Sequence, residues 1–168
     1  NAAAGLRHGG AKAVIFGDPH WSDERKEPIV RAFAQAMRDL RSYIPGPDMG
    51  TNERCMAWIR DEIGRAVGLP PEIGGVPLDE IGATGLGLAA SAEVAASYCD
   101  VSLDGARVAI QGYGNVGRHA ARFLEERGAV VIAVSDSTGV AVDRSGLSLD
   151  TLDALKHQGR SVSEYDGG

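Results

Sequence analysis

The stretch RVAIQGYGNVG, residues 107–117, decides the fold of the second half of this chain. Its first five residues are mostly apolar and predict a strand, which a glycine-rich turn follows at once. Residues 116–127 then predict a helix. The run VVIAV, residues 130–134, is typical of a strand that is buried on both faces of a parallel sheet. This order of strand, helix and strand is a βαβ unit, so we expect an α/β fold.

The turn in this unit carries the spacing G-x-G-x-x-G, which in this context favours a dinucleotide site. Gly112 makes the turn, Gly114 lets a pyrophosphate approach the backbone, and Gly117 allows close packing of helix and strand. The pyrophosphate would lie on the N-terminus of the helix at Asn115 and Val116, where free N–H groups favour anions. A purely structural turn is the alternative.

An acidic residue, Asp136, ends the second strand of the unit. A carboxylate at this place accepts hydrogen bonds from the ribose hydroxyls and repels a 2′-phosphate, so we expect NAD as the coenzyme. Ser137 and Thr138 have hydroxyl groups that can bind a phosphate, so NADP stays possible. The nearest downstream cation in the sequence is Arg144.

Two short glycine-flanked stretches in the first half each carry one charged residue. They are GGAK, which ends at Lys12, and PGPDMGT, residues 45–51, which contains Asp48. Glycine lets the backbone approach a ligand closely. A lysine and a carboxylate in one cleft are the groups that proton transfer at a carbonyl or an amine requires. Each residue taken alone is more often a surface or turn residue.

The remaining pattern predicts further elements around these motifs. We expect a strand at residues 13–17, and then a helix from Ser22 with an apolar stripe that reaches Leu40. Thr51 or Asn52 would cap the next helix. Two more helices are expected, from Thr84 to about Cys99 and over residues 148–157. A proline- and glycine-rich loop places the boundary near Gly82, which gives a partial substrate domain, 1–82, and a partial dinucleotide-binding Rossmann domain, 83–168.

The composition limits the class of protein. A net charge of −6 and an isoelectric point of about 5.2 argue against a nucleic-acid partner, which needs a concentrated basic face. The uncharged stretches fall short of the roughly 20 apolar residues that span a bilayer, so no membrane partner is expected. Cys55 and Cys99 are isolated and the four histidines are scattered, so we expect neither a disulfide nor a metal. Together these features favour a cytoplasmic protein.

Read in order, five motifs resemble the glutamate/leucine/phenylalanine/valine dehydrogenase superfamily, and glutamate dehydrogenases most of all. They are NAAAGL with GGAK (1–12), IPGPDMGT (44–51), GATGLG (82–87), VAIQGYGNVG (108–117) and AVSDSTG (133–139). The resemblance implies that Lys12 polarises the substrate carbonyl and that Asp48 transfers protons as general acid and base. It also implies that Thr84 and Asn115 hold the carboxamide of the nicotinamide.

The same resemblance implies a function and a context. The function is reversible, NAD(P)-dependent oxidative deamination of an L-amino acid, most simply L-glutamate, to a 2-oxo acid and ammonia by a homo-oligomer, a hexamer in this family. Leucine, valine or phenylalanine as substrate is an alternative, and a non-catalytic nucleotide-binding module is another. The family's second substrate lysine would immediately precede Asn1, so we expect the chain to be the central portion of a longer polypeptide.

Overall fold

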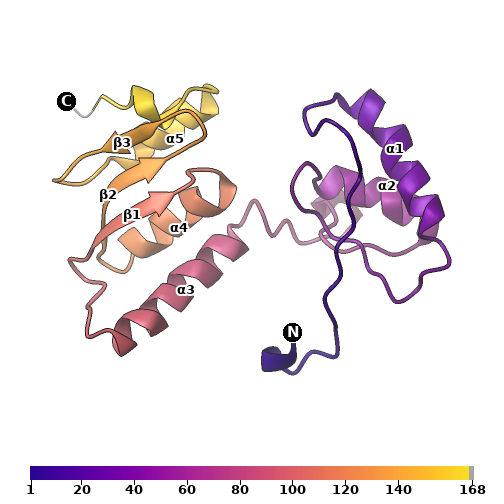
Figure 1. Cartoon of the computed structure of the whole chain (residues 1–168), viewed down its shortest axis with the longest axis horizontal. Coiled ribbons are helices and arrows are strands. Elements are labelled where there is room, and N and C mark those ends of the chain that lie inside the picture. Colours follow the sequence, from indigo (N-terminus) through magenta and orange to yellow (C-terminus); the bar gives the residue numbers. More distant parts are fainter. Residues whose placement is uncertain (167–168) are drawn as a thin grey trace. The chain divides into compact units, whose positions relative to one another are not determined.

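The computed structural model describes residues 1–166 and divides the chain into two compact units. Unit 1 is Asn1–Pro77 and unit 2 is Leu78–Gly168 (Figure 1). The boundary predicted after Gly82 lies a few residues C-terminal to this division between Pro77 and Leu78. Residues 78–82 belong to unit 2, where the backbone carbonyl of Asp79 accepts a hydrogen bond from the side chain of Asn115, 3.1 Å away.

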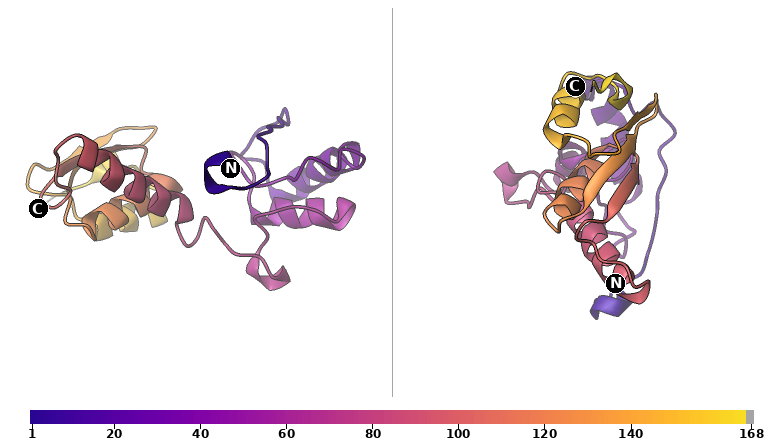
Figure 2. Two further views of the ribbon diagram at one scale, coloured as in Figure 1. Left: turned by 90° about the horizontal axis from the view of Figure 1, so that it is seen from below. Right: turned by 90° about the vertical axis from the view of Figure 1, so that its left-hand side faces the viewer.

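Unit 1 is built on two helices, α1 (Asp23–Ala36) and α2 (Glu53–Ile63), which lie alongside each other (Figure 2). Short 3-10 helices occupy Ala2–Ala4 (η1) and Pro71–Ile73 (η2). The side chain of Asn52 accepts a hydrogen bond from the N–H of Cys55 and so caps α2. The core consists of apolar side chains from both helices: Val30, Ala34, Cys55, Met56, Trp58 and Ile59.

The prediction of a strand at residues 13–17 is wrong. This segment contains no strand, because it pairs with no neighbouring backbone within residues 1–166. It keeps the alternation of an extended chain: Ile15 packs against the core of unit 1, while Val14 and Phe16 are fully exposed. The helix from Ser22 also ends before Leu40, which is half exposed.

Unit 2 contains the predicted βαβ unit. Strand β1 (Arg107–Gln111) pairs in parallel with β2 (Val130–Ser135), and α4 (Asn115–Glu125) connects them. Helix α3 (Ala83–Tyr98) packs against α4 (Figure 1). The α/β fold is therefore confirmed. Beyond β2 lie β3 (Val140–Val142), α5 (Leu149–His157) and the 3-10 helix η3 (Val162–Glu164).

Strand β3 was not predicted from the sequence. It pairs antiparallel with the end of β2, which gives the sheet order β1-β2-β3. The strand is three residues long, and only Ala141 is buried, so it has too few residues for a recognisable periodic pattern. None of the helices within residues 1–166 combines the length and apolar character that crossing a membrane requires.

Candidate active site and nucleotide site

The structure brings Lys12 and Asp48 together, although 36 residues separate them in the sequence. The Lys12 ammonium forms an ion pair with Oδ2 of Asp48, and both side chains are more than half exposed. An ion pair this exposed adds little to the stability of a fold. The pair therefore matters because it places a lysine and a carboxylate in one candidate site. The N–H of Met49 donates to Oδ1 of Asp48 at 2.8 Å, which leaves Oδ2 for the lysine.

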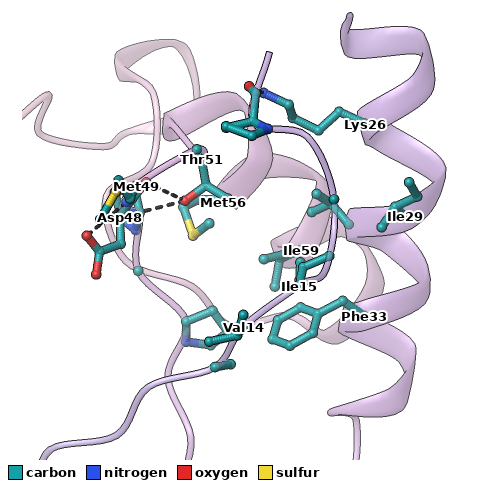
Figure 3. A pocket seen from close by; sticks show the side chains of 18 of the residues that line it. Val14, Ile15, Lys26, Ile29, Phe33, Asp48, Met49, Thr51, Met56 and Ile59 are labelled. Carbon is teal, nitrogen blue, oxygen red and sulfur yellow. Dashed lines mark hydrogen bonds between the residues drawn. The ribbon is translucent and has the colours of Figure 1, made fainter. Parts of the chain in front are cut away.

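Local hydrogen bonds hold the Asp48 loop in place. The N–H of Asp48 donates to Oγ1 of Thr51, and both the N–H and the hydroxyl of Thr51 donate to the carbonyl of Asp48, all at 2.9 Å. Figure 3 shows Thr51 beside Asp48, with dashed lines for the hydrogen bonds between them. These reciprocal bonds fix the loop backbone before any ligand binds.

The pocket beside the pair has a volume of about 620 Å³ and lies within unit 1. Most of its wall is apolar and comes from α1, α2 and the extended segment that follows Lys12 (Figure 3): Ile15, Ile29, Phe33, Met56 and Ile59. Besides Lys12, its wall includes one other cation, Lys26, whose ammonium donates to the carbonyl of Pro19 at 2.8 Å. The pocket therefore offers an apolar wall with the Lys12–Asp48 pair at its edge.

Arg65 supports the segment that leads to Asp48, and the sequence analysis did not single it out. Its guanidinium donates to the carbonyls of Met37 at 2.6 Å, Leu40 at 3.0 Å and Tyr43 at 3.1 Å. The N–H of Val67 donates to the carbonyl of Pro45, which follows in the same segment. A basic residue just beyond a helix is a known signal for capping carbonyls, but the sequence does not show which helix it caps.

The glycine loop of unit 2 has the geometry that its motif predicts. Gly112 has a φ of +93°, and a Cβ on Gly117 would lie 1.9 Å from the carbonyl oxygen of Gly112. The N–H groups of Gly112 and Tyr113 both donate to the carbonyl of Ser135, at 3.1 and 2.6 Å. A Cβ on Gly114 would meet nothing within 4 Å, so this side of the loop is open to a ligand.

Thr84 and Asn115 lie in the first turns of two helices that pack together, α3 and α4. The two helices approach closely, since a Cβ on Gly85 would lie 2.6 Å from Cβ of His119. The Asn115 amide fastens the loop before α3 through Asp79. Thr84 and Val116 are both exposed, so each is accessible in the first turn of its helix.

A second pocket, of about 450 Å³, lies beside the glycine loop. Its wall is made by the loop, the end of β2 and one residue of α5: Gly112, Tyr113, Gly114, Ser135, Asp136, Ser137 and Lys156, with Gln111. Lys156, rather than the nearer Arg144, is the cation of this pocket, and its ammonium lies 3.0 Å from Oδ2 of Asp136. The sequence carries no signal for this pairing, because α5 brings Lys156 back from 20 positions downstream.

Asp136 has protein partners on both carboxylate oxygens. Hydrogen bonds from the backbone N–H of Val162 and from the hydroxyl and N–H of Thr138 hold its pKa far below the usual range. Lys156 adds to this effect, and the side chain is only 10% exposed. The contact with a ribose that the sequence assigns to Asp136 stays a prediction, and here the carboxylate serves the protein itself.

Tyr113 links the glycine loop to the helices behind it. Its side chain is buried, and its hydroxyl donates to Oδ1 of Asp153 at 3.0 Å. The guanidinium of Arg122 donates to the other oxygen of Asp153 at 2.7 and 3.1 Å, and it also reaches Asp150 at 2.8 Å. Burial, and then the charge of Asp153, raise the pKa of Tyr113 well above its usual value. The loop, α4 and α5 therefore share one network.

Within residues 1–166, no three His, Cys, Asp or Glu side chains gather as a metal site would require. Both cysteines are free thiols, Cys55 buried and Cys99 exposed. The candidate groups for chemistry are Lys12 and Asp48 in unit 1 and the pocket beside the glycine loop in unit 2.

Comparison with known proteins gives matches over both units. The chain is 36% identical over 181 residues to a glutamate dehydrogenase of Aeropyrum pernix, a match that covers 100% of this chain and 43% of the relative. An NADP(+)-dependent glutamate dehydrogenase of Pyrobaculum calidifontis is 38% identical over 160 residues, with 88% and 38% covered. An NAD-specific glutamate dehydrogenase A of Halobacterium salinarum is 35% identical over 177 residues, with 98% and 40% covered.

The fold has a matching solved structure, the hetero-hexameric glutamate dehydrogenase of Thermus thermophilus in its leucine-bound form. The TM-score is 0.74 at 31% identity, with 87% of this chain and 38% of that chain covered. The chain thus spans less than half the length of the relatives it matches. Residues 1–65 match the model of the Glu/Leu/Phe/Val dehydrogenase dimerisation domain, and residues 74–168 match that of the glutamate/leucine/phenylalanine/valine dehydrogenases. The chain belongs to the glutamate/leucine/phenylalanine/valine dehydrogenase family.

Proposed function

We propose that this chain carries part of the catalytic site and part of the coenzyme site of an L-amino-acid dehydrogenase that acts on L-glutamate. The reaction is the reversible oxidative deamination of the amino acid to a 2-oxo acid and ammonia, with NAD or NADP as acceptor. The observation that carries the proposal is the ion pair between Lys12 and Asp48 at the edge of one pocket. Membership of the family supports the same reaction.

In this proposal Lys12 supplies a fixed positive charge and Asp48 transfers protons. The Lys12 ammonium lies beside the oxygen of the substrate carbonyl and stabilises the negative charge that develops there. Asp48 takes a proton from the attacking amine or water and returns it to the leaving group. The loop bonds from Met49 and Thr51 hold the carboxylate so that Oδ2 faces the lysine.

We assign the adenosine half of the coenzyme to the pocket of unit 2 and the rest of it to the start of α4 and α3. Gly112, Gly114 and Gly117 shape the loop, the free N–H groups at Asn115 and Val116 receive the pyrophosphate, and Gly114 faces open space. Thr84 and Asn115 hold the nicotinamide carboxamide, and Asp136 and Ser137 lie at the ribose end. A bound NAD or NADP would supply the hydride acceptor for the Cα–H of the substrate. Relatives named for each coenzyme support both.

The apolar wall beside the pair favours a second candidate, an enzyme for leucine, valine or phenylalanine. The side chains of Ile15, Phe33 and Ile59 suit an aliphatic or aromatic substrate, whereas the carboxylate of glutamate requires a cation. Lys26 is the cation in this wall besides Lys12. Initial rates with the four amino acids at equal concentration decide between the two candidates, and the favoured reading expects glutamate to give the largest kcat/KM.

The family also supports proposals about assembly and location. The dimerisation-domain match over residues 1–65 supports self-association, and the hetero-hexameric Thermus structure supports an assembly of six subunits, so we propose a homo-hexamer. For the location we propose the cytoplasm, on the sequence argument that two isolated cysteines match no disulfide framework. Sedimentation of the purified protein measures the assembly directly.

Asp48→Asn in the full-length protein tests the proposed chemistry. Removal of a general acid/base should lower kcat at least ~100-fold while the Kd for the coenzyme stays within twofold. Asp18→Asn is the matched control, because Asp18 lines the same pocket but accepts only a local bond from the N–H of His20. Near-normal turnover in Asp48→Asn excludes the role. Coenzyme binding by a wild-type protein without deamination on any of the four amino acids would identify a nucleotide-binding module.

A further inference from the structure

Asp136 is surrounded by hydrogen-bond donors from the protein. Oδ1 lies within hydrogen-bond distance of the N–H of Thr138 (3.0 Å), the N–H of Gly139 (3.1 Å), and the hydroxyls of Thr138 (2.7 Å) and Ser161 (3.0 Å). Oδ2 faces the N–H of Val162 at 2.9 Å and the ammonium of Lys156 at 3.0 Å. A carboxylate offers about four lone-pair positions, so these donors use its whole capacity. The ribose hydroxyls would have to displace one of them.

The charge of Asp136 is also balanced within the protein. Lys156 contacts it directly, and three backbone N–H dipoles point at it. Its side chain is 10% exposed, against 29% for Lys156. An opposite charge at this distance cancels most of the field that the carboxylate exerts in the pocket, so a 2′-phosphate meets little net repulsion from it.

The contacts of Asp136 join segments that are far apart in the sequence. Oδ1 closes the turn from Asp136 to Gly139, whose backbone bond runs from the N–H of Asp136 to the carbonyl of Gly139 at 2.9 Å. Both oxygens then reach the start of η3 through Ser161 and Val162. The carboxylate thus holds the end of β2, and with it Ser137, at a fixed place beside the glycine loop.

We propose that Asp136 is a positioning residue of the coenzyme site and does not select between NAD and NADP. The usual rule is that an acidic residue at the end of the second strand binds the ribose 2′-hydroxyl and so selects NAD. The inference rests on the proposed function, because it assigns the pocket beside Gly112 and Gly114 to the adenosine half of the coenzyme. Loss of the carboxylate lowers the affinity for NAD and for NADP by the same factor, because the loss loosens the rim of the pocket and removes no repulsion.

Asp136→Asn in the full-length protein tests this with 5′-AMP and adenosine 2′,5′-bisphosphate, two probes that differ only in the 2′-phosphate. Calorimetry should show both Kd values raised about fivefold, which corresponds to about 1 kcal/mol, and their ratio within twofold of wild type. The KM for the amino acid should stay within twofold, which would show that the substrate site of unit 1 is intact. The matched control is Asp143→Asn, because within residues 1–166 the Asp143 carboxylate accepts bonds only from its own turn, from Ser145 and Gly146. It should leave both Kd values unchanged.

Each outcome has a defined meaning. A tenfold or larger gain in the relative affinity for the bisphosphate would make Asp136 the discriminator and overturn the proposal. Unchanged Kd values for both probes would overturn the positioning role. A wild-type protein that binds neither probe would refute the coenzyme site itself, and thus the proposed function. If Asp136→Asn does not fold, Ser161→Ala decides. It removes one partner of Oδ1 and should raise both Kd values together; unequal shifts or none at all would overturn the proposal.

Discussion

Asp153→Ala is the most informative single test of the structure of unit 2. It removes the carboxylate that joins the Tyr113 hydroxyl to the guanidinium of Arg122. The variant leaves a buried phenol without a partner, because the Tyr113 side chain is only 1% exposed. Arg122 keeps its contact with Asp150.

The expected loss follows from these contacts. An unsatisfied buried hydroxyl costs about 1–3 kcal/mol, and a lost hydrogen bond to a charged group costs about 1.5–3 kcal/mol. The side chain of Arg122 is 41% exposed, so water replaces part of the hydrogen bonding that the guanidinium loses. We therefore expect a net loss of about 3 kcal/mol in the free energy of unfolding of unit 2.

Amide hydrogen exchange of β1 and β2 measures this loss within unit 2 alone. Both tryptophans, Trp21 and Trp58, belong to unit 1, so the urea dependence of tryptophan fluorescence should stay unchanged. The matched control is Asp150→Ala. Asp150 pairs with the same arginine, but its side chain is 89% exposed against 15% for Asp153. Its loss should stay below about 1 kcal/mol.

Two results would refute the reasoning. Equal losses in Asp153→Ala and Asp150→Ala would show that the burial of Asp153 does not matter. A double-mutant cycle with Tyr113→Phe should give a coupling energy of about 1 kcal/mol between Tyr113 and Asp153. Zero coupling would show that the hydroxyl and the carboxylate do not act on each other.

Two further predictions concern acid stability and the glycine loop. Because the folded protein holds the pKa of Asp136 far below its usual value, the unfolded chain takes up the proton first as the pH falls. The stabilisation from Asp136 is therefore complete above the unfolded pKa of about 4 and is lost as the pH falls below it. In an acid titration followed by circular dichroism, the free energy of unfolding should therefore fall less in Asp136→Asn than in wild type. Gly117→Ala should destabilise unit 2 by about 2 kcal/mol or more and abolish coenzyme binding, since its Cβ would overlap the carbonyl of Gly112. A Gly117→Ala protein with wild-type Tm and coenzyme Kd would contradict this reading of the loop.

The sequence alone determined the βαβ unit and the turn inside it. The stretch RVAIQGYGNVG contains an apolar strand, glycines where the turn and the close helix packing require them, and the start of a helix. Each of these signals is local, because strand periodicity and the steric demand at Gly112 and Gly117 depend on near neighbours. The Lys12 and Asp48 motifs are local in the same sense, but it was their resemblance to the family that assigned both residues to one site.

Only the tertiary structure decided the partners of these residues. A strand needs a hydrogen-bonded neighbour, so the apolar run 13–17 stays extended within residues 1–166. The pairings of Lys156 with Asp136, Asp153 with Tyr113 and Arg65 with the carbonyls after α1 depend on how distant segments pack. Sequence spacing gives the face of a helix on which a charge lies, but not which distant group meets it. For that reason the sequence assigned Asp136 to a ribose, and the packed chain surrounds it with its own donors.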